Sequence, residues 1–533
     1  MIALLLACSG SPSTGSLSAS GDTLVVAYQA SPNSMLSMTA QTAADHDIID
    51  NLFLHLLEVD FDCGLNFKPG LATRWEFSEE GTELRMWLRD DVTWSDGQPF
   101  TAEDLAFTYE LTGDEAVASP RFPATLHMEP DSRPEVIGPH EVVWRFTQAY
   151  DRNTMLAHVN EVRPAPKHAL VEADRLTLRG HAFGRNPVVN GPWRIYDFSP
   201  DERLVLVPSA GAQVNLARVI FKVLPEYATR VMELENGSVD MVMSLQIEDA
   251  DRVRREHPEI RLVRRGWRST DFLAWNTTNP LFADAQVRRA LSTAINVDKM
   301  IDDLLTSRET GESYGKRAVS SVSPALCSSH NNDITPLPFD PEGARKMFAT
   351  AGWTDSDGDG VLDKNGKDFA FTLLTNSGNP RRARAAILIQ SNLKDVGVKV
   401  EISKLESNTF FSGLRKREFE AALSGWVASD YVDLSGLWHS GEEYAQNYPG
   451  YSNPEVDALI DEALATSDPE KAAQLWMDVQ AQVYEDQPYT FLFWRDEIIG
   501  VSDRFEDATV DFVSPIRHLD RWTVPPEKVK YGH

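Results

Sequence analysis

The sequence predicts a mixed α/β fold that is divided into several domains. At 533 residues the chain is too long for one hydrophobic core, because single cores stop growing at roughly 250–300 residues. Short segments with apolar residues at every second position alternate with segments in which apolar residues recur three or four positions apart. This alternation is typical of strands that are followed by helices. With 42% apolar and 25% charged residues, the composition is that of a folded, soluble chain.

Strands and helices alternate in the N-terminal half. Residues 82–94 place Leu84, Met86 and Leu88 on one face, which predicts a half-buried strand. A turn follows at 95–97, and the capping-box pattern of residues 101–104 predicts the start of a helix. Further along we expect short strands at 203–208 and 218–224 and a helix around 227–236.

Helices predominate in the C-terminal half. Asp-Pro or Asn-Pro pairs beginning at residues 340, 453 and 468 predict three helix starts, because Asp and Asn cap a helix and proline fits its first turn. Residues 384–396 carry one apolar stripe and predict a helix, and 398–404 alternate like a strand.

The charge balance excludes some classes of partner. The chain has 51 Lys and Arg against 80 Asp and Glu, a net charge of −29, which argues against nucleic acid and anionic membrane surfaces. Signatures of zinc hydrolases, serine hydrolases, nucleotide-binding loops and clustered Cys/His metal sites do not occur in it. The sequence therefore gives no indication of catalysis.

The three cysteines are too few for a disulfide scaffold. Cys63 and Cys327 either pair in an oxidising compartment or stay as two buried thiols, and the sequence leaves both alternatives open. Cys8 follows a short apolar run and precedes a Ser/Gly-rich stretch, an arrangement that resembles the lipobox of bacterial lipoproteins. That resemblance implies lipidation at Cys8 and a flexible tether within 1–21, and the alternative is a frayed apolar tail.

Five segments in order resemble one known family. The first reads PGLATRWEFSEEGTELRMWLRDDVTWSDGQPFTAEDLAFTYE, and the last begins with GWVASDYVDLSGLW. Together they resemble the extracellular solute-binding proteins of family 5, which are the oligopeptide-, dipeptide- and nickel-binding proteins of ABC transporters. The segments are 69–110, 186–206, 272–301, 339–367, and 425–438 with 451–463.

The resemblance implies a two-lobed periplasmic-binding-protein (Venus-flytrap) fold with an extra subdomain inserted in the first lobe. By analogy, lobe I would comprise 22–47, 187–270 and 492–533, with 48–186 as the inserted subdomain, and lobe II would comprise 271–491. Two strands that cross near residues 270 and 491 would form the hinge, and closure about it would bury the ligand.

The function that the resemblance implies is that of a substrate-binding lipoprotein of an ABC importer. Such a protein captures oligopeptides in the interlobe cleft and delivers them to the permease. We expect a monomer without a required cofactor, anchored by lipid at the periplasmic or outer face of a bacterial membrane. The alternative within the same fold is a binder of an oligosaccharide or a metal chelate. A secreted hydrolase is a remote alternative, because no nucleophile and base are visible together.

A buried peptide needs a carboxylate for its ammonium group. Family peptide binders place an aspartate shortly after a Gly-Trp pair, often beside an aromatic residue. The resemblance therefore implies that Asp430 binds the ammonium beside Trp426 and Tyr431, with Asp433 as the second candidate because the spacing is one residue longer than usual.

Three further residues are weaker candidates for ligand contact. Trp275 and Asn276 occupy the family position close to the cleft, and the alternative for them is packing at the end of a strand. Phe122 is expected on the rim of the cleft by the same analogy.

Residues 355–363 match the first nine positions of an EF-hand calcium loop. Gly366 occupies the position of the bidentate Glu, so the strongest ligand is missing. The pattern predicts a weak structural calcium site or a plain surface turn, and its four candidate ligands are Asp355, Asp357, Asp359 and Asp363.

Overall fold

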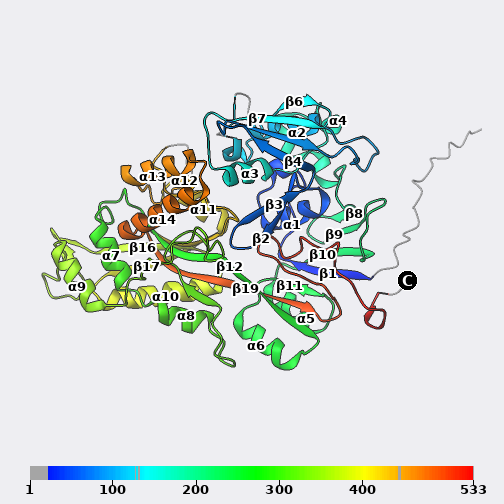
Figure 1. The fold of residues 1–533 in the computed structure, drawn as a ribbon. Helices are drawn as coiled ribbons and strands as arrows, with labels where there is room; N and C mark the ends of the chain where they lie inside the picture. The colour runs from blue at the N-terminus through cyan, green and yellow to red at the C-terminus, as the bar shows by residue number, and fades with distance from the viewer. Residues whose placement is uncertain (1–21, 126–127, 130–132, 442–445, 532–533) are drawn as a thin grey trace, which may run out of the picture.

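The structure is a computed structural model, and it describes residues 22–125, 128–129, 133–441 and 446–531. Cys8 and the tether predicted for residues 1–21 lie outside the described residues. Strands and helices alternate along the described chain, which confirms the mixed α/β prediction. Figure 1 shows two masses with a pair of long strands running between them.

One eleven-stranded sheet extends through both masses in the order β17-β16-β18-β12-β19-β11-β1-β10-β9-β8, with β13 paired to β19. We call the mass around β1 lobe I and the mass around β16 lobe II; the residue boundaries of the lobes stay a prediction. The strands of lobe I are β1 (Thr23–Tyr28), β8 (Trp193–Ser199), β9 (Arg203–Pro208), β10 (Arg218–Val223) and β11 (Met241–Val242). Those of lobe II are β13 (Gly315–Arg317), β16 (Ala370–Asn376), β17 (Lys399–Leu405) and β18 (Ala421–Val427).

The long strands β12 (Ile260–Trp275) and β19 (Tyr489–Ser502) belong to both lobes. Their antiparallel pairing is interrupted between Arg265 and Ser269, and Trp267 in this interruption has a φ of 50°. Because a bulge disrupts the ladder of hydrogen bonds, it is the point where two paired strands bend most easily. The interruption lies near residue 270, where the family resemblance implies the hinge.

A smaller unit covers lobe I on one side, at the top of Figure 1. It contains a four-stranded sheet in the order β4-β5-β7-β6 and the hairpin β2–β3. Its strands are β2 (Leu57–Phe61), β3 (Leu65–Pro69), β4 (Ala72–Phe77), β5 (Glu83–Leu88), β6 (Glu135–Gly138) and β7 (Glu141–Arg145). Its helices are α2 (Ala102–Gly113), α3 (Arg152–Asn160) and α4 (Lys167–Leu170), and α1 (Ala43–Leu52) precedes them.

Most other helices cover lobe II, and the three predicted Asx-Pro starts are confirmed there. The side chains of Asp340, Asn453 and Asp468 accept hydrogen bonds from backbone N–H groups in the first turns of α9 (Pro341–Thr350), α13 (Pro454–Ala465) and α14 (Pro469–Asp486), respectively. None of the helices in the described part of the chain combines the length and the apolar composition that crossing a membrane requires. The remaining helices of the described chain are α5 (Tyr227–Glu235) and α6 (Ile247–Glu256), which lie beside β11 and the first part of β12, and α7 (Ala285–Thr293), α8 (Val297–Leu305), α10 (Pro380–Asp395), α11 (Ser407–Arg415) and α12 (Ser435–Trp438).

The two faces of the central sheet bury two separate hydrophobic clusters. In β12 Phe272 and Ala274 belong to one cluster, whereas Leu273 and Trp275 belong to the other. This split follows from the two-residue period of a strand. The first cluster also includes the inner sides of α13 and α14, and the second includes α7 to α10.

A buried ion cluster lies where β12 and β18 pair. Asp271 is only 1% exposed and accepts hydrogen bonds from Arg381 Nε at 2.9 Å and Arg382 Nε at 3.2 Å. Although burial acts to raise it, the pKa of Asp271 is held well below its usual range by these guanidinium groups and by Arg495. Burial lowers the pKa of Arg495 to about 10.

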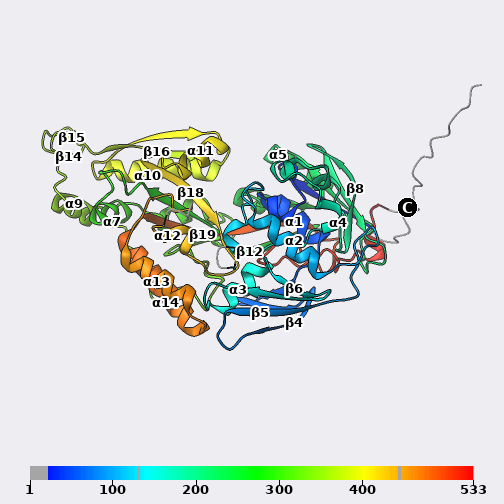
Figure 2. The ribbon, with the colours of Figure 1, turned by 90° about the horizontal axis from the view of Figure 1, so that it is seen from above.

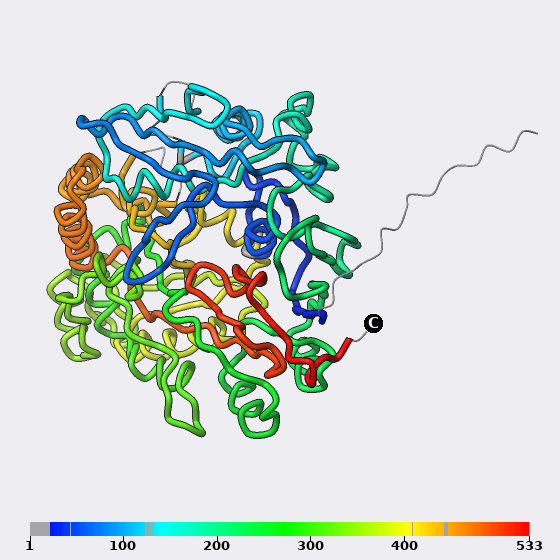
Figure 3. Tube along the Cα trace, turned by 45° about the vertical axis from the view of Figure 1, so that its right-hand side comes forward, coloured from blue at the N-terminus to red at the C-terminus, as the bar shows by residue number. Residues whose placement is uncertain are grey.

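The C-terminal segment returns to the first strand. Figure 3 shows this segment, in red, passing beside the blue β1 strand, and Lys530 N donates a hydrogen bond to Asp22 Oδ2 at 2.7 Å. Of the two alternatives for the central cysteines, the structure contains the bond: Cys63 and Cys327 form a disulfide across 264 residues of sequence.

Candidate functional site

The candidate site is a cavity of about 470 Å³ between the smaller unit and lobe II. In Figure 2 α13 and α14 lie beside α3, and Asp151 N donates to Leu464 O at 3.1 Å between them. A second cavity of about 120 Å³ shares Leu326, Tyr431 and Val432 with the first. The larger cavity is lined by the β2–β3 turn, the first turn of α3, residues 326, 328, 329 and 430–432, and the first two turns of α14.

Asp430 lines the larger cavity, three residues after β18 ends. Among the described residues, none forms an ion pair with its carboxylate or donates a side-chain hydrogen bond to it. Burial raises the pKa of Asp430, and the charge of Glu161 acts in the same direction, whereas Arg268 opposes the shift. The site therefore holds an ionisable carboxylate whose charge is only partly compensated.

The carboxylate of Asp433, the second candidate, already has hydrogen-bond donors within the protein. Its Oδ1 accepts from Ser435 N at 2.9 Å and from Ser435 Oγ at 2.6 Å. Its Oδ2 lies 3.7 Å from His158 Nε2, and burial lowers the pKa of that histidine. Asp433 therefore fixes the turn that leads into α12, and of the two candidates Asp430 is the one that lines the larger cavity.

Two predicted aromatic residues line the cavities. Trp426 borders the smaller cavity and stacks between Tyr448 at 5.1 Å and Phe272 at 6.0 Å, measured between ring centroids. Tyr431 borders both cavities and packs edge-on against His158 at 5.6 Å. Their rings offer rigid apolar surface to a ligand.

The other three predicted residues do not line either cavity. Trp275 is fully buried on the opposite face of the sheet, and its Nε1 donates to Thr490 Oγ1 at 3.0 Å. Asn276 Nδ2 donates to Phe419 O at 2.8 Å, so the amide is used in a loop contact. Phe122 is 40% exposed in the 3-10 turn Phe122–Thr125.

Several lining residues were not predicted from the sequence. Asp151 and Thr154 come from the start of α3, and Glu470 and Gln474 come from the start of α14. The Asp-Pro pair at residue 468 predicts where α14 begins but not what its first turns face. Asp430, Asp151 and Glu470 are the charged residues of the larger cavity, and neither cavity has Lys, Arg or His among the described lining residues.

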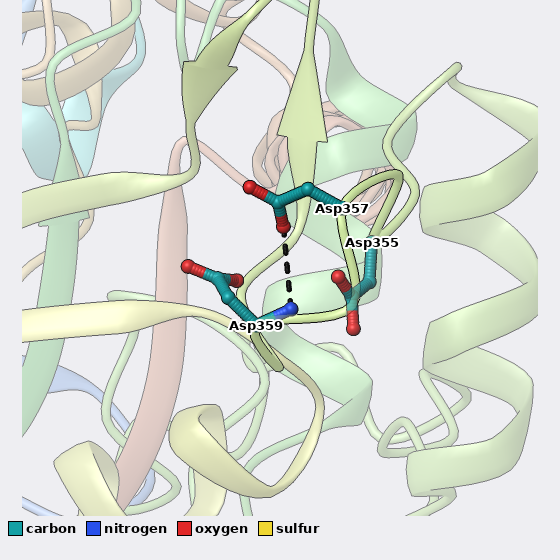
Figure 4. A group of neighbouring side chains, drawn as sticks. All are labelled: Asp355, Asp357 and Asp359. Atoms are coloured by element: carbon teal, nitrogen blue, oxygen red, sulfur yellow. Dashed lines mark hydrogen bonds between the residues drawn. The ribbon is translucent and has the colours of Figure 1, made fainter.

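The predicted calcium ligands lie on an exposed turn, remote from the cavities. Figure 4 shows Asp355, Asp357 and Asp359, whose carboxylate oxygens lie within 4.8 Å of one another. Asp363 does not join them in this group, and its carboxylate accepts hydrogen bonds from Ser356 N at 2.8 Å and Ser356 Oγ at 2.9 Å. It starts the short strand β14 (Asp363–Lys364), which pairs with β15 (Lys367–Asp368).

A weak calcium site at this turn stays a prediction. Three aspartates without the bidentate ligand should bind calcium only at about millimolar concentration. Calcium at about ten millimolar should therefore raise the unfolding midpoint slightly, and the Asp355→Asn/Asp357→Asn variant should abolish that rise. Differential scanning fluorimetry with calcium or with a chelator checks this. A shift at micromolar calcium, or an equal shift in the variant, would contradict it.

The sequence matches the model of one protein family. The model for bacterial extracellular solute-binding proteins, family 5, matches residues 66–448. The oligopeptide-binding protein AppA of Bacillus subtilis is 27% identical over 535 residues, which cover 97% of this chain and 96% of that protein. The nickel-binding periplasmic protein of Escherichia coli is 23% identical over 79% of this chain and 80% of its own length.

A solved structure of the same relative has the same fold. The oligopeptide-binding protein AppA from Bacillus subtilis, in complex with a nonapeptide, superimposes with a TM-score of 0.82 at 26% identity. The match covers 95% of this chain and 99% of that chain. The predicted two-lobed fold is thereby confirmed.

Proposed function

This chain belongs to the bacterial extracellular solute-binding proteins of family 5, and from that premise we propose that it captures oligopeptides for an ABC importer. Members of the family are binding proteins that serve transport and are not enzymes. The ligand would occupy the cavity between the smaller unit and lobe II, and the closed protein would deliver it to the permease.

The observation that carries this proposal is the carboxylate of Asp430. It lines the larger cavity, it is half-buried, and Arg268 offsets its charge only partly. A buried charge is costly unless it is paired, so the site is completed by a cation. The ammonium group of a peptide supplies such a cation together with a hydrogen-bond donor.

The charge of the cavity separates peptides from the alternatives. A neutral oligosaccharide can donate hydroxyl hydrogen bonds to a carboxylate and can stack on Trp426 and Tyr431, but it brings no positive charge to compensate Asp430. An anionic metal chelate would meet Asp430, Asp151 and Glu470 with no basic side chain among the described lining residues. A ligand with a protonated amine therefore fits best.

The lipid anchor belongs to the same proposal. Lipidation at Cys8 would hold the binding protein at the membrane beside its permease, with residues 9–21 as the tether. Mass spectrometry of the mature N-terminus from membrane fractions tests this: a diacylglyceryl mass on Cys8 supports the anchor, and an unmodified cysteine contradicts it.

Native mass spectrometry of protein that has not been refolded tests the ligand class. We expect a ladder of short peptides to be released from it. Sugars or metal complexes in their place would contradict the peptide proposal.

The affinity for peptides should fall in acid. A free Asp titrates near pH 3.9 and a peptide ammonium near pH 8, so the ammonium keeps its charge as the pH falls. Because the pKa of Asp430 is raised, its carboxylate takes up a proton, and so loses its negative charge, at a higher pH than a free aspartate does. Calorimetric titration of tetraalanine from neutral pH to about pH 4 checks this. The Asp430→Asn variant is the control, since its weaker binding should lack this pH dependence.

A further inference from the structure

The disulfide between Cys63 and Cys327 lies at the edge of the larger cavity. Cys63 is in the turn between β2 and β3, and Cys327 is in the loop that follows β13. The neighbouring residues Gly64, Leu326 and Ser328 line the cavity itself. The Cα atoms of the two cysteines are 4.8 Å apart, and both residues are exposed.

The Cys63 side is attached to lobe I. In β2, Phe61 stacks on Phe512 with ring centroids 4.1 Å apart. Arg517 donates from Nη1 to Val59 O and from Nη2 to Glu58 Oε2, both at 3.1 Å. Phe512 and Arg517 belong to the C-terminal segment that follows β19 and returns to β1. The hairpin is therefore fixed to the lobe I side of the cavity.

The Cys327 side is attached to lobe II through Gln480 of α14. Gln480 Nε2 donates to Ser329 O at 2.8 Å, and its Oε1 accepts from Ser320 Oγ at 2.9 Å and from Asn331 N at 3.1 Å. Asn331 Nδ2 donates to Met477 O at 2.9 Å. The loop that carries Cys327 is thus held to α14 at residues on both sides of the cysteine.

We propose that this disulfide is a covalent latch across the cavity, so that ligand exchange takes place in the dithiol form of the protein. The role as a gate for ligand rests on the proposed function, whereas the latch itself does not. Separation of the lobes must break the contacts that cross between them. Ser328 Oγ bonded to Cys63 O at 3.0 Å and Asp151 N bonded to Leu464 O are hydrogen bonds that thermal motion can break. A covalent bond between two anchored segments cannot be broken in this way.

The chemistry of the latch is thiol–disulfide exchange. A thiolate of a dithiol reductant attacks the sulfur of one cysteine, forms a mixed disulfide with it and releases the other cysteine as a thiolate. The second thiol of the reductant then displaces the first cysteine from the mixed disulfide. Cys63 and Cys327 gain two electrons and two protons, and the reductant leaves as a disulfide. An oxidising disulfide partner reverses these steps. The exposure of both cysteines gives such partners access to the bond.

The test compares the full chain in four states: oxidised wild type, wild type treated with a phosphine reductant, the Cys63→Ser/Cys327→Ser double variant, and the Cys8→Ser variant as matched control. Hydrogen exchange of residues 64–65, 326–329 and 470–477 reports opening without any ligand. We expect faster exchange in the reduced wild type and in the double variant, and slow exchange in the oxidised wild type and in Cys8→Ser.

Uptake of tetraalanine by ligand-stripped protein, followed by native mass spectrometry, reports access to the cavity. It should be more than about tenfold faster in the reduced and double-variant proteins. Equal exchange and equal uptake in all four states would overturn the latch, as would free thiols at Cys63 and Cys327 in protein from an oxidising compartment. Opening without tetraalanine binding in any state would instead contradict the peptide proposal. Reduced wild type supplies the same comparison should the double variant fail to fold, and circular dichroism verifies folding in each state.

Discussion

Replacing Asp430 with asparagine should weaken peptide binding strongly. Loss of one partner from a buried, hydrogen-bonded charge pair costs about 2–5 kcal/mol. This corresponds to a loss of affinity of roughly thirtyfold to several-thousandfold. Calorimetric titration with tetraalanine at neutral pH measures the effect, because Asp430 lines the larger cavity and Arg268 offsets its charge only partly.

The same substitution should stabilise the ligand-free protein. The raised pKa of Asp430 means that the folded state holds its proton more tightly than the unfolded state does. Above that pKa the charged carboxylate therefore lowers the free energy of unfolding. The loss is about 1.4 kcal/mol when the folded and unfolded pKa values differ by one. Asp430→Asn removes the charge, so urea unfolding should give a higher free energy of unfolding at neutral pH.

Asp433→Asn is the matched control. Asp433 accepts two hydrogen bonds from Ser435, lies beside His158 and lines only the smaller cavity, so its replacement should lower stability and change affinity much less than Asp430→Asn does. If Asp430→Asn destabilised the protein and left tetraalanine affinity unchanged, Asp430 would be a structural residue and the peptide proposal would lose its main support.

Asp271→Asn should destabilise the protein by about 3–5 kcal/mol, because removal of one partner leaves buried guanidinium groups uncompensated. Asp271 is paired with Arg381 and Arg382, and its pKa is held well below the usual range. A depressed carboxyl pKa contributes stability above the pKa of the unfolded state, and this stability is lost as the pH falls. The variant should therefore show its deficit at neutral pH and approach the wild type in acid.

Urea unfolding at neutral and at acidic pH measures this difference. Asp298→Asn is the control, because Asp298 pairs with Arg317 at 3.2 Å while its side chain is 67% exposed. Such a surface pair contributes about 0–1 kcal/mol. A loss in Asp271→Asn no larger than the loss in Asp298→Asn would show that the arginines find other partners.

Local features of the fold were predictable from the sequence. The helix starts at Asp340, Asn453 and Asp468 each depend on a capping side chain and on the proline that follows it directly. Because both residues are adjacent in the sequence, the sequence alone predicts the helix start. The central part of β12 is different. Residues 264–268, which read RRGWR, show no strand pattern, and the strand continues through them because β19 pairs on either side.

The site was only partly predictable from the sequence, because several of its residues come together only in the folded protein. Asp430 followed from a family pattern, but Asp151 and Glu470 reach the cavity only through the way the lobes meet. Trp275 lies on the opposite face from Phe272 because strand residues alternate. Both faces of β12 are buried there, so hydrophobicity does not show which one faces the ligand.

The continuous sheet determines how this protein can be divided experimentally. Residues 260–265 and 269–274 of β12 both pair with β19, one stretch on each side of the bulge. A fragment that ends at the bulge would therefore lose half of each long strand and expose unpaired N–H and C=O groups along a hydrophobic edge. Exposed edges of this kind pair with other chains and aggregate. Separate expression of the two lobes should yield insoluble protein, and a soluble split form requires cuts in surface loops that leave β12 and β19 intact.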